Sequence, residues 1–139
     1  YNEFFKFSFV RNPWDRALSM YKHVMREEHK QRRYKMDTLK DTSFKNFLNV
    51  YAGKKDLQPQ TYWLKNFKGE IPLDFVGRFE NLQGDFDLAC SKMSLPTSKL
   101  PHIYKGNGED YRHSYDTQLV DLVQKVYEEE IKLFGYKFE

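Results

Sequence analysis

The sequence predicts a helix-rich α/β layer fold with a small parallel sheet. An aromatic, partly alternating run over 4–10 is typical of a mostly buried strand, and a second such run lies over 73–79. Each run leads into a segment whose apolar residues recur at helical spacing. Strands that alternate with helices favour parallel pairing, because the intervening helix returns the chain to the same end of the sheet.

The helix after the first strand has a defined start. Asn12 is a preferred N-cap residue, and Pro13 suits the first helical position because it has no N–H to leave unbonded. An apolar stripe then follows at Trp14, Ala17, Leu18, Tyr21, Val24 and Met25. The stripe predicts a helix with one face on the core, and the polar residues over 29–35 are expected to be solvated.

Two further helices have start or stop signals in the middle of the chain. Ser43 is expected to cap a helix over 44–51, and Gly53 to end it. Asn81 is expected to cap the helix that follows the second strand. The segment over 57–68 has no decisive pattern, whereas two prolines and two glycines over 95–108 predict a loop.

A last helix is expected from about Asp116 to near Gly135. Its apolar positions are Leu119, Leu122, Val123, Val126 and Tyr127. Tyr136 and Phe138 are expected to pack as a tail.

Length and composition indicate one soluble globular domain over 1–139. Aromatic residues make up 17% of the chain, which supports a packed core, and the net charge is only +3 although 31% of residues are charged. This balance disfavours a disordered chain or a dedicated DNA-coating protein. The lone Cys90 excludes an internal disulfide framework, disfavours a cysteine metal site and suggests a reducing, cytoplasmic location. No apolar segment approaches a membrane span, and we expect no metal.

Arg11 lies where the first strand runs into a helix. Such a junction is suited to an anion, since the helix N-terminus offers N–H groups and a positive dipole end, and Arg11 adds a charge. The alternative is a strand-end arginine that pairs with a carboxylate such as Asp15. The pattern by itself leaves both interpretations open.

The run from Arg11 to Ser19 (RNPWDRALS) resembles the 3′-phosphate-binding motif of sulfotransferases, which use 3′-phosphoadenosine 5′-phosphosulfate. Segments over 75–82, 100–102 and 131–138 are similar to other parts of bacterial and carbohydrate sulfotransferases. The resemblance implies a partial P-loop-like sulfotransferase fold. It also implies that Arg11 and Ser19 contact the 3′-phosphate of the donor, or of adenosine 3′,5′-bisphosphate.

Three more positions take a role from the resemblance. The stretch over 104–112 resembles, more loosely, a late glycine-containing loop that closes over the nucleotide, which implies contacts from Lys105 and Gly106. Glycine permits close approach of the backbone to phosphate, and lysine supplies charge. Phe79 lies where relatives can present an aromatic ring near the adenine. The alternative for Phe79 is an ordinary buried core residue.

The resemblance starts after the family's 5′-phosphosulfate loop and its usual catalytic base. We therefore expect the C-terminal portion of a sulfotransferase domain, with no catalytic residue assigned and little or no activity of the 139 residues alone. In complete relatives a sulfuryl group passes to an acceptor hydroxyl, for example of a carbohydrate. The segment over 56–68 can line an acceptor groove or simply pack.

Two other functions fit parts of the sequence. One is a truncated, non-catalytic interaction module that forms a homo-oligomer through exposed sheet edge and apolar surface. The other is nucleic-acid binding by a basic stripe with Tyr21 and Tyr34 interleaved. That stripe comprises Arg16, Arg26, Arg32, Arg33 and Lys35, and Asp15, Glu27 and Glu28 interrupt it.

Overall fold

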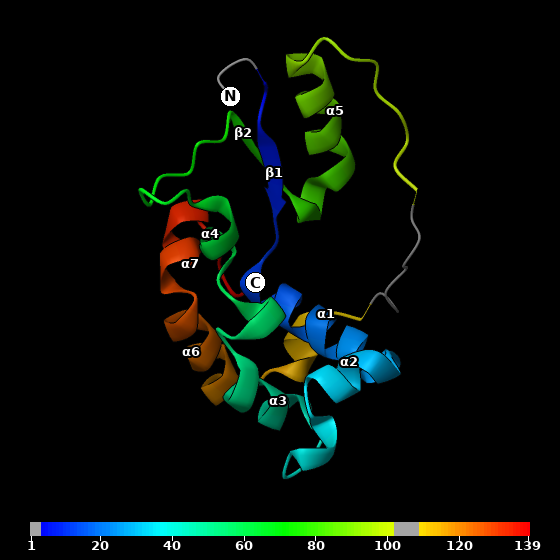
Figure 1. Cartoon of the computed structure of the whole chain (residues 1–139), viewed down its shortest axis with the longest axis vertical. Coiled ribbons are helices and arrows are strands. Elements are labelled where there is room, and N and C mark those ends of the chain that lie inside the picture. The colour runs from blue at the N-terminus through cyan, green and yellow to red at the C-terminus, as the bar shows by residue number, and fades with distance from the viewer. Residues whose placement is uncertain (1–3, 102–108) are drawn as a thin grey trace. The chain divides into compact units, whose positions relative to one another are not determined.

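The computed structural model describes residues 4–101 and 109–139 of the chain, which is shown in Figure 1. The chain divides into two compact units. The sheet unit comprises Tyr1–Arg11 and Gln60–Glu109, and the helical unit comprises Asn12–Pro59 and Asp110–Glu139. That the whole chain forms one domain stays a prediction.

The sheet unit is built around two parallel strands. It contains β1 (Phe7–Val10), α4 (Gln60–Leu64), β2 (Phe75–Arg78) and α5 (Leu82–Lys92), with a 3₁₀ turn at Phe79–Asn81. Phe7 lies opposite Phe75 and Val10 opposite Arg78. The predicted fold class, helix-rich α/β with a small parallel sheet, is confirmed over the residues that the structure describes.

Gly77 is required by close packing across the two strands. It lies opposite Phe9, and a Cβ atom at Gly77 would be 2.5 Å from Cε1 of the Phe9 ring and 3.0 Å from Cβ of Asp85. A larger residue would therefore push the ring away from β2. Glycine here allows Phe9 and α5 to approach the same stretch of strand.

α5 begins where the sequence predicts, but Asn81 does not cap it. The Asn81 side chain instead donates from Nδ2 to Oδ1 of Asp85, at 3.0 Å. The other carboxylate oxygen of Asp85 accepts the backbone N–H of Arg78 at 2.6 Å, so this acidic residue in the first turn connects the strand to the helix. Cys90 lies on the buried side of α5.

The helical unit holds most of the aromatic core. It contains α1 (Pro13–Arg26), α2 (Glu28–Arg33), α3 (Phe44–Tyr51), α6 (Thr117–Val126) and α7 (Glu128–Phe134), with 3₁₀ turns at Met36–Thr38, Lys55–Leu57 and Tyr111–Ser114. Trp14 is fully buried and donates from its indole N–H to the carbonyl of Val120. The contact joins α1 to α6 in the centre of this unit.

The predicted helix signals in this unit are confirmed for α1 and α3. The Asn12 side chain accepts the backbone N–H of Trp14 at 3.0 Å. Ser43 accepts the backbone N–H of Asn46 at 3.2 Å. Gly53, just beyond α3, has a φ of +74°, a left-handed conformation that glycine adopts without strain.

The prediction of one long last helix is wrong, because Tyr127 separates α6 from α7. Its backbone lies at φ −111° and ψ 23°, outside helical geometry. Its buried hydroxyl donates to the carbonyl of Leu57 at 2.7 Å and accepts the N–H of Gly53 at 3.0 Å. The break coincides with this tertiary anchor, which the apolar periodicity does not reveal.

Aromatic packing corrects one prediction and confirms another. Tyr34, expected in a solvated stretch, is fully buried, with its ring centroid 4.9 Å from that of Tyr51. The tail packs as predicted, since Tyr136 is buried and the ring of Phe138 lies 5.7 Å from that of Trp14. Among the described residues, no helix is long and apolar enough to cross a membrane.

Candidate functional site

Arg11 and Phe79 lie together at the carboxyl end of the two strands. Val10 pairs with Arg78, so Arg11 and Phe79 are the next residues along β1 and β2. The guanidinium carbon of Arg11 lies 4.2 Å from the centroid of the Phe79 ring. Ligands of parallel α/β sheets bind at this end of the strands, which makes the pair the best candidate for a binding site.

Phe79 is not the buried core residue of the alternative interpretation. Its side chain is 44% exposed, and its ring supports a cation. A guanidinium over an aromatic face is attracted by the electron-rich ring, and it keeps its N–H donors in its own plane. The ring therefore restricts where Arg11 can direct its donors.

Gln60, the first residue of α4, holds the backbone of Arg11. Its side-chain oxygen Oε1 accepts the backbone N–H of Arg11 at 2.8 Å, and its Nε2 donates to the carbonyl of Arg11, also at 2.8 Å. In the sequence, Gln60 falls within the segment over 56–68, which was expected either to line an acceptor groove or to pack. The two residues are 49 positions apart, so no local pattern connects them.

The start of α1 differs from the expected anion site in one respect. Pro13 has no N–H, and the N–H groups of Trp14 and, more weakly, Asp15 are directed to the Asn12 side chain. The next N–H, of Arg16, bonds to the carbonyl of Asn12. The helix start has therefore already used the donors that were expected to receive an anion.

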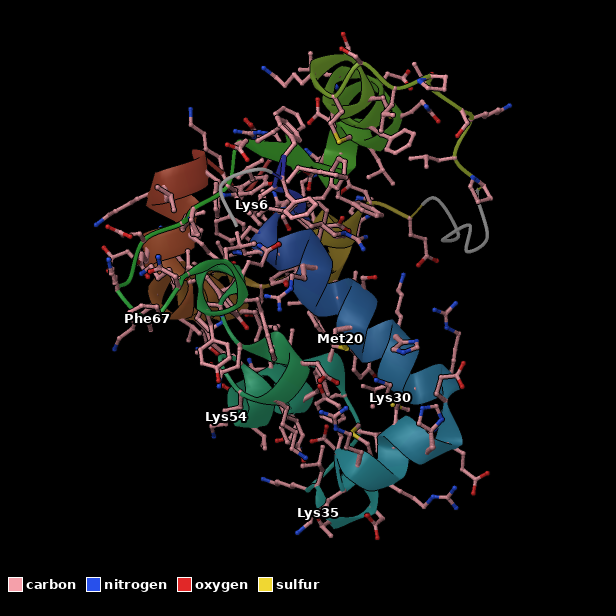
Figure 2. The ribbon with its side chains drawn as sticks, turned by 45° about the horizontal axis from the view of Figure 1, so that its top comes forward. Lys6, Met20, Lys30, Lys35, Lys54 and Phe67 are labelled. Carbon is pink, nitrogen blue, oxygen red and sulfur yellow. The ribbon has the colours of Figure 1, made fainter. Side chains whose placement is uncertain are left out.

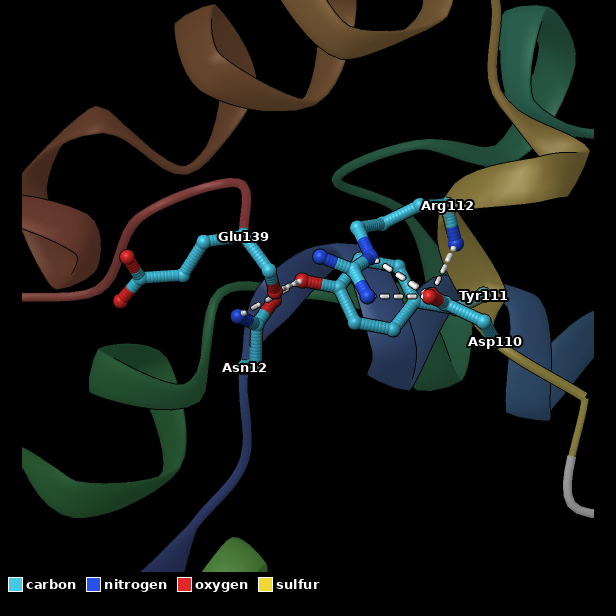
Figure 3. A network of polar contacts seen from close by, with 5 residues as sticks. All are labelled: Asn12, Asp110, Tyr111, Arg112 and Glu139. Atoms are coloured by element: carbon cyan, nitrogen blue, oxygen red, sulfur yellow. Dashed lines mark hydrogen bonds and ion pairs between the residues drawn. The ribbon is translucent and has the colours of Figure 1, made fainter.

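Asn12 is the centre of a structural network, and Figure 3 shows the part of it that involves Tyr111 and Glu139. Its Nδ2 donates to the carbonyl of Lys137 at 3.0 Å and to the hydroxyl of Tyr111 at 3.4 Å. Tyr111 in turn donates to a backbone oxygen of Glu139 at 2.5 Å. Asn12 thus connects the start of α1 to the end of the chain, and its role is structural.

Asp110 and Arg112 form a compact ion pair in the same region (Figure 3). The Nε of Arg112 lies 2.8 Å from Oδ1 and 2.7 Å from Oδ2 of Asp110. These hydrogen bonds lower the pKa of Asp110 to about 2. The pair fixes the turn Tyr111–Ser114, so Arg112 is committed to a neighbour rather than to a ligand.

The other predicted site residues are not brought to Arg11 within the sheet unit. Ser19 is half-buried on α1 in the helical unit. Lys105 and Gly106 lie outside the described residues. The structure therefore joins Arg11 to Phe79, while the contributions of Ser19, Lys105 and Gly106 stay predictions.

The aromatic residues of the α4 region are exposed. Tyr62 and Trp63 are 61% and 62% exposed, with ring centroids 4.9 Å apart. Phe67, labelled in Figure 2, is 96% exposed. Leu57 and Thr61 of the same segment are buried, so the segment packs in part, and its expected role in acceptor binding stays a prediction.

Several basic residues on α1 and α2 contact acceptors of their own unit, among them Lys30, which is labelled in Figure 2. Arg33 pairs with Asp56 at 2.9 Å, and Lys30 lies 3.5 Å from the same carboxylate. Arg16 donates to the carbonyls of Asp56 and Gln58. With Tyr34 buried as well, the arrangement gives little support to a nucleic-acid stripe.

A small parallel sheet that presents a positioned arginine at the carboxyl end of its strands defines an α/β protein with a candidate anion-binding site. The family model described as "Sulfotransferase family" matches residues 1–137. The chain therefore belongs to the sulfotransferase family, and this membership supports a sulfotransferase-type function with a sulfuryl donor.

An uncharacterized protein of Archaeoglobus fulgidus is 29% identical over 108 residues, which cover 76% of this chain and 81% of that protein. No solved structure matched the chain. Among the described residues, no group of three or more His, Cys, Asp or Glu side chains is placed to hold a metal ion.

Proposed function

We propose that this chain binds the 3′-phosphate side of 3′-phosphoadenosine 5′-phosphosulfate, or of adenosine 3′,5′-bisphosphate, through Arg11. The observation that carries the proposal is the position of Arg11 at the carboxyl end of β1, with its guanidinium on the Phe79 ring. Family membership supports the choice of nucleotide.

The chemistry of Arg11 suits a phosphate group. Its guanidinium presents a planar set of N–H donors that matches two phosphate oxygens, and each charge-assisted hydrogen bond contributes about 1.5–3 kcal/mol net. Because the start of α1 has used its first N–H groups on Asn12, the side chain of Arg11 supplies most of the attraction. The proposed site thus depends on one cation more than on a helix dipole.

The remaining contacts follow from the resemblance. We assign Ser19 as a hydroxyl donor to the same phosphate and Lys105 and Gly106 as a basic, close-approaching loop over the nucleotide. Phe79 is assigned first to orienting Arg11, with stacking on adenine as its second role. None of these residues is assigned to catalysis.

The reaction of the complete site would be transfer of a sulfuryl group to an acceptor hydroxyl. The oxygen of the acceptor forms a bond to sulfur, the bond from sulfur to the nucleotide phosphate breaks, and a base takes the hydroxyl proton. Positioned cations stabilise the charge that develops on the departing phosphate. The acceptor, for which a carbohydrate is our proposal, belongs to the same hypothesis.

Calorimetric titration with adenosine 3′,5′-bisphosphate tests the proposal. Arg11→Ala should weaken binding by roughly 10- to 100-fold, the loss of one charge-assisted contact, whereas 5′-AMP should bind both proteins equally. Arg32→Ala is a matched control, because it removes an exposed arginine that pairs with Glu28. A wild-type chain that binds no nucleotide, or an Arg11→Ala variant with wild-type affinity, contradicts the proposal.

A further inference from the structure

We propose that Gln60 is a positioning residue for the 3′-phosphate of the nucleotide, acting through the backbone of Arg11. This inference rests on the proposed function, because it assigns how the binding arginine is held. Neither the motif from Arg11 to Ser19 nor any other segment that carries the resemblance contains Gln60.

The contact is a two-point clamp. Arg11 follows the last residue of β1, where its backbone N–H and carbonyl need partners. The primary amide of Gln60 supplies one acceptor and one donor, each at 2.8 Å, as a neighbouring strand would. A single side chain therefore extends the pairing of β1 by one residue.

The clamp is specific to a glutamine. Alanine offers neither hydrogen bond, and an ionised glutamate can accept the Arg11 N–H but places a second anionic oxygen against the Arg11 carbonyl. A protonated glutamic acid can both accept and donate. In a Gln60→Glu variant, low pH should therefore restore both hydrogen bonds to the Arg11 backbone.

Two restraints act on Arg11 at different points. Gln60 fixes its backbone, while the Phe79 ring, 4.2 Å from the guanidinium carbon, limits its side chain. A binding arginine that is held before the ligand arrives loses less conformational freedom on binding. Gln60 therefore contributes to affinity without touching the nucleotide.

The first measurement tests the clamp without nucleotide. Amide hydrogen exchange of Arg11, followed by NMR in the full chain, should be faster in Gln60→Ala than in wild type. Asn66→Ala is the matched control, since the Asn66 side chain also holds backbone N–H groups in the sheet unit, at Lys68 and Glu70. Unchanged exchange at Arg11 in Gln60→Ala overturns the inference.

The second measurement tests whether Gln60 acts on the 3′-phosphate site or only supports the structure in general. Gln60→Ala should weaken the binding of adenosine 3′,5′-bisphosphate about tenfold, as expected for the loss of one or two hydrogen bonds, and leave 5′-AMP unchanged. Equal weakening of both nucleotides indicates a merely structural role and overturns the inference. A wild-type chain that binds neither nucleotide contradicts the proposed function itself and, with it, the role of Gln60.

The conservative variant adds a pH signature. Affinity of Gln60→Glu for the bisphosphate, divided by that of wild type at the same pH, should rise as pH falls from about 7 toward about 4, where the glutamate gains its proton. The ratio for Gln60→Ala should stay level over the same range. A level ratio for both variants overturns the clamp.

Discussion

The side chain of Arg11 is supported by the residue that directly follows the other strand. Phe79 follows β2 and presents a half-exposed ring, on which the guanidinium lies. A cation on an exposed aromatic face gains about 0.5–1 kcal/mol. This interaction gives Phe79 a physical role before any adenine is bound.

Replacement of Phe79 distinguishes its two roles. Phe79→Leu should weaken adenosine 3′,5′-bisphosphate binding by about 0.5–1 kcal/mol, since the guanidinium loses its ring, and leave 5′-AMP binding unchanged. Phe79→Tyr keeps the aromatic face and should bind both nucleotides as wild type does. Titration calorimetry with both ligands measures this, and a loss of affinity for 5′-AMP as well would show that adenine stacking dominates.

At the scale of elements, the start of α1 is the best-determined junction in the helical unit. Asn12 is buried, caps the helix and holds the carbonyl of Lys137. The Asn12 amide thus accepts a hydrogen bond from the start of α1 and donates one to the backbone carbonyl of Lys137. Loss of a cap costs about 1 kcal/mol, and loss of the part-buried hydrogen bond to the carbonyl of Lys137 costs about 1 kcal/mol more.

We therefore expect Asn12→Ala to lower the free energy of unfolding by about 2 kcal/mol. Asn12→Asp keeps the capping oxygen but loses the donor and places a buried anionic oxygen against the carbonyl of Lys137, so it should also be less stable than wild type. Urea denaturation followed by circular dichroism gives both values. If Asn12→Ala has the stability of wild type, the network in Figure 3 contributes nothing measurable to folding.

Elements with local signals were predictable from the sequence. The caps at Asn12 and Ser43 depend on residues two or three positions away, and both strands follow from short apolar runs. The burial of Tyr34 and the helix break at Tyr127 were not predicted, because contacts with residues distant in the sequence decide both.

At the candidate site, too, some features were predictable from local sequence and others depend on tertiary structure. Arg11 was identified from its own motif, whereas the parallel register places Phe79 beside it. The clamp by Gln60 depends on a residue 49 positions away, and no periodicity encodes such a contact. Local chemistry thus predicts Arg11 as the binding residue, and tertiary structure decides what holds its backbone and side chain.

At the scale of the whole chain, the residues that hold Arg11 and most of the aromatic core belong to different units. Arg11, Gln60 and Phe79 are in the sheet unit, whereas Tyr34, Tyr115 and Tyr127 are in the helical unit. Burial raises the pKa of Tyr34 to about 12, with the carboxylate of Asp56 adding to the effect. Burial also raises the pKa of Tyr115 and of Tyr127.

These shifts predict loss of stability at alkaline pH. A tyrosine in the unfolded chain ionises near pH 10, whereas folded Tyr34 keeps its proton to about 12. Its contribution is therefore intact below pH 10 and is lost as pH rises through this window. Unfolding free energies from urea titrations at pH 8 to about 12 should fall above about pH 10.

Tyr34→Phe, which removes the ionising hydroxyl, should reduce this fall in the free energy of unfolding, whereas Tyr62→Phe, at an exposed site, should not. Equal profiles for wild type and Tyr34→Phe would show that ionisation of this buried ring does not limit alkaline stability.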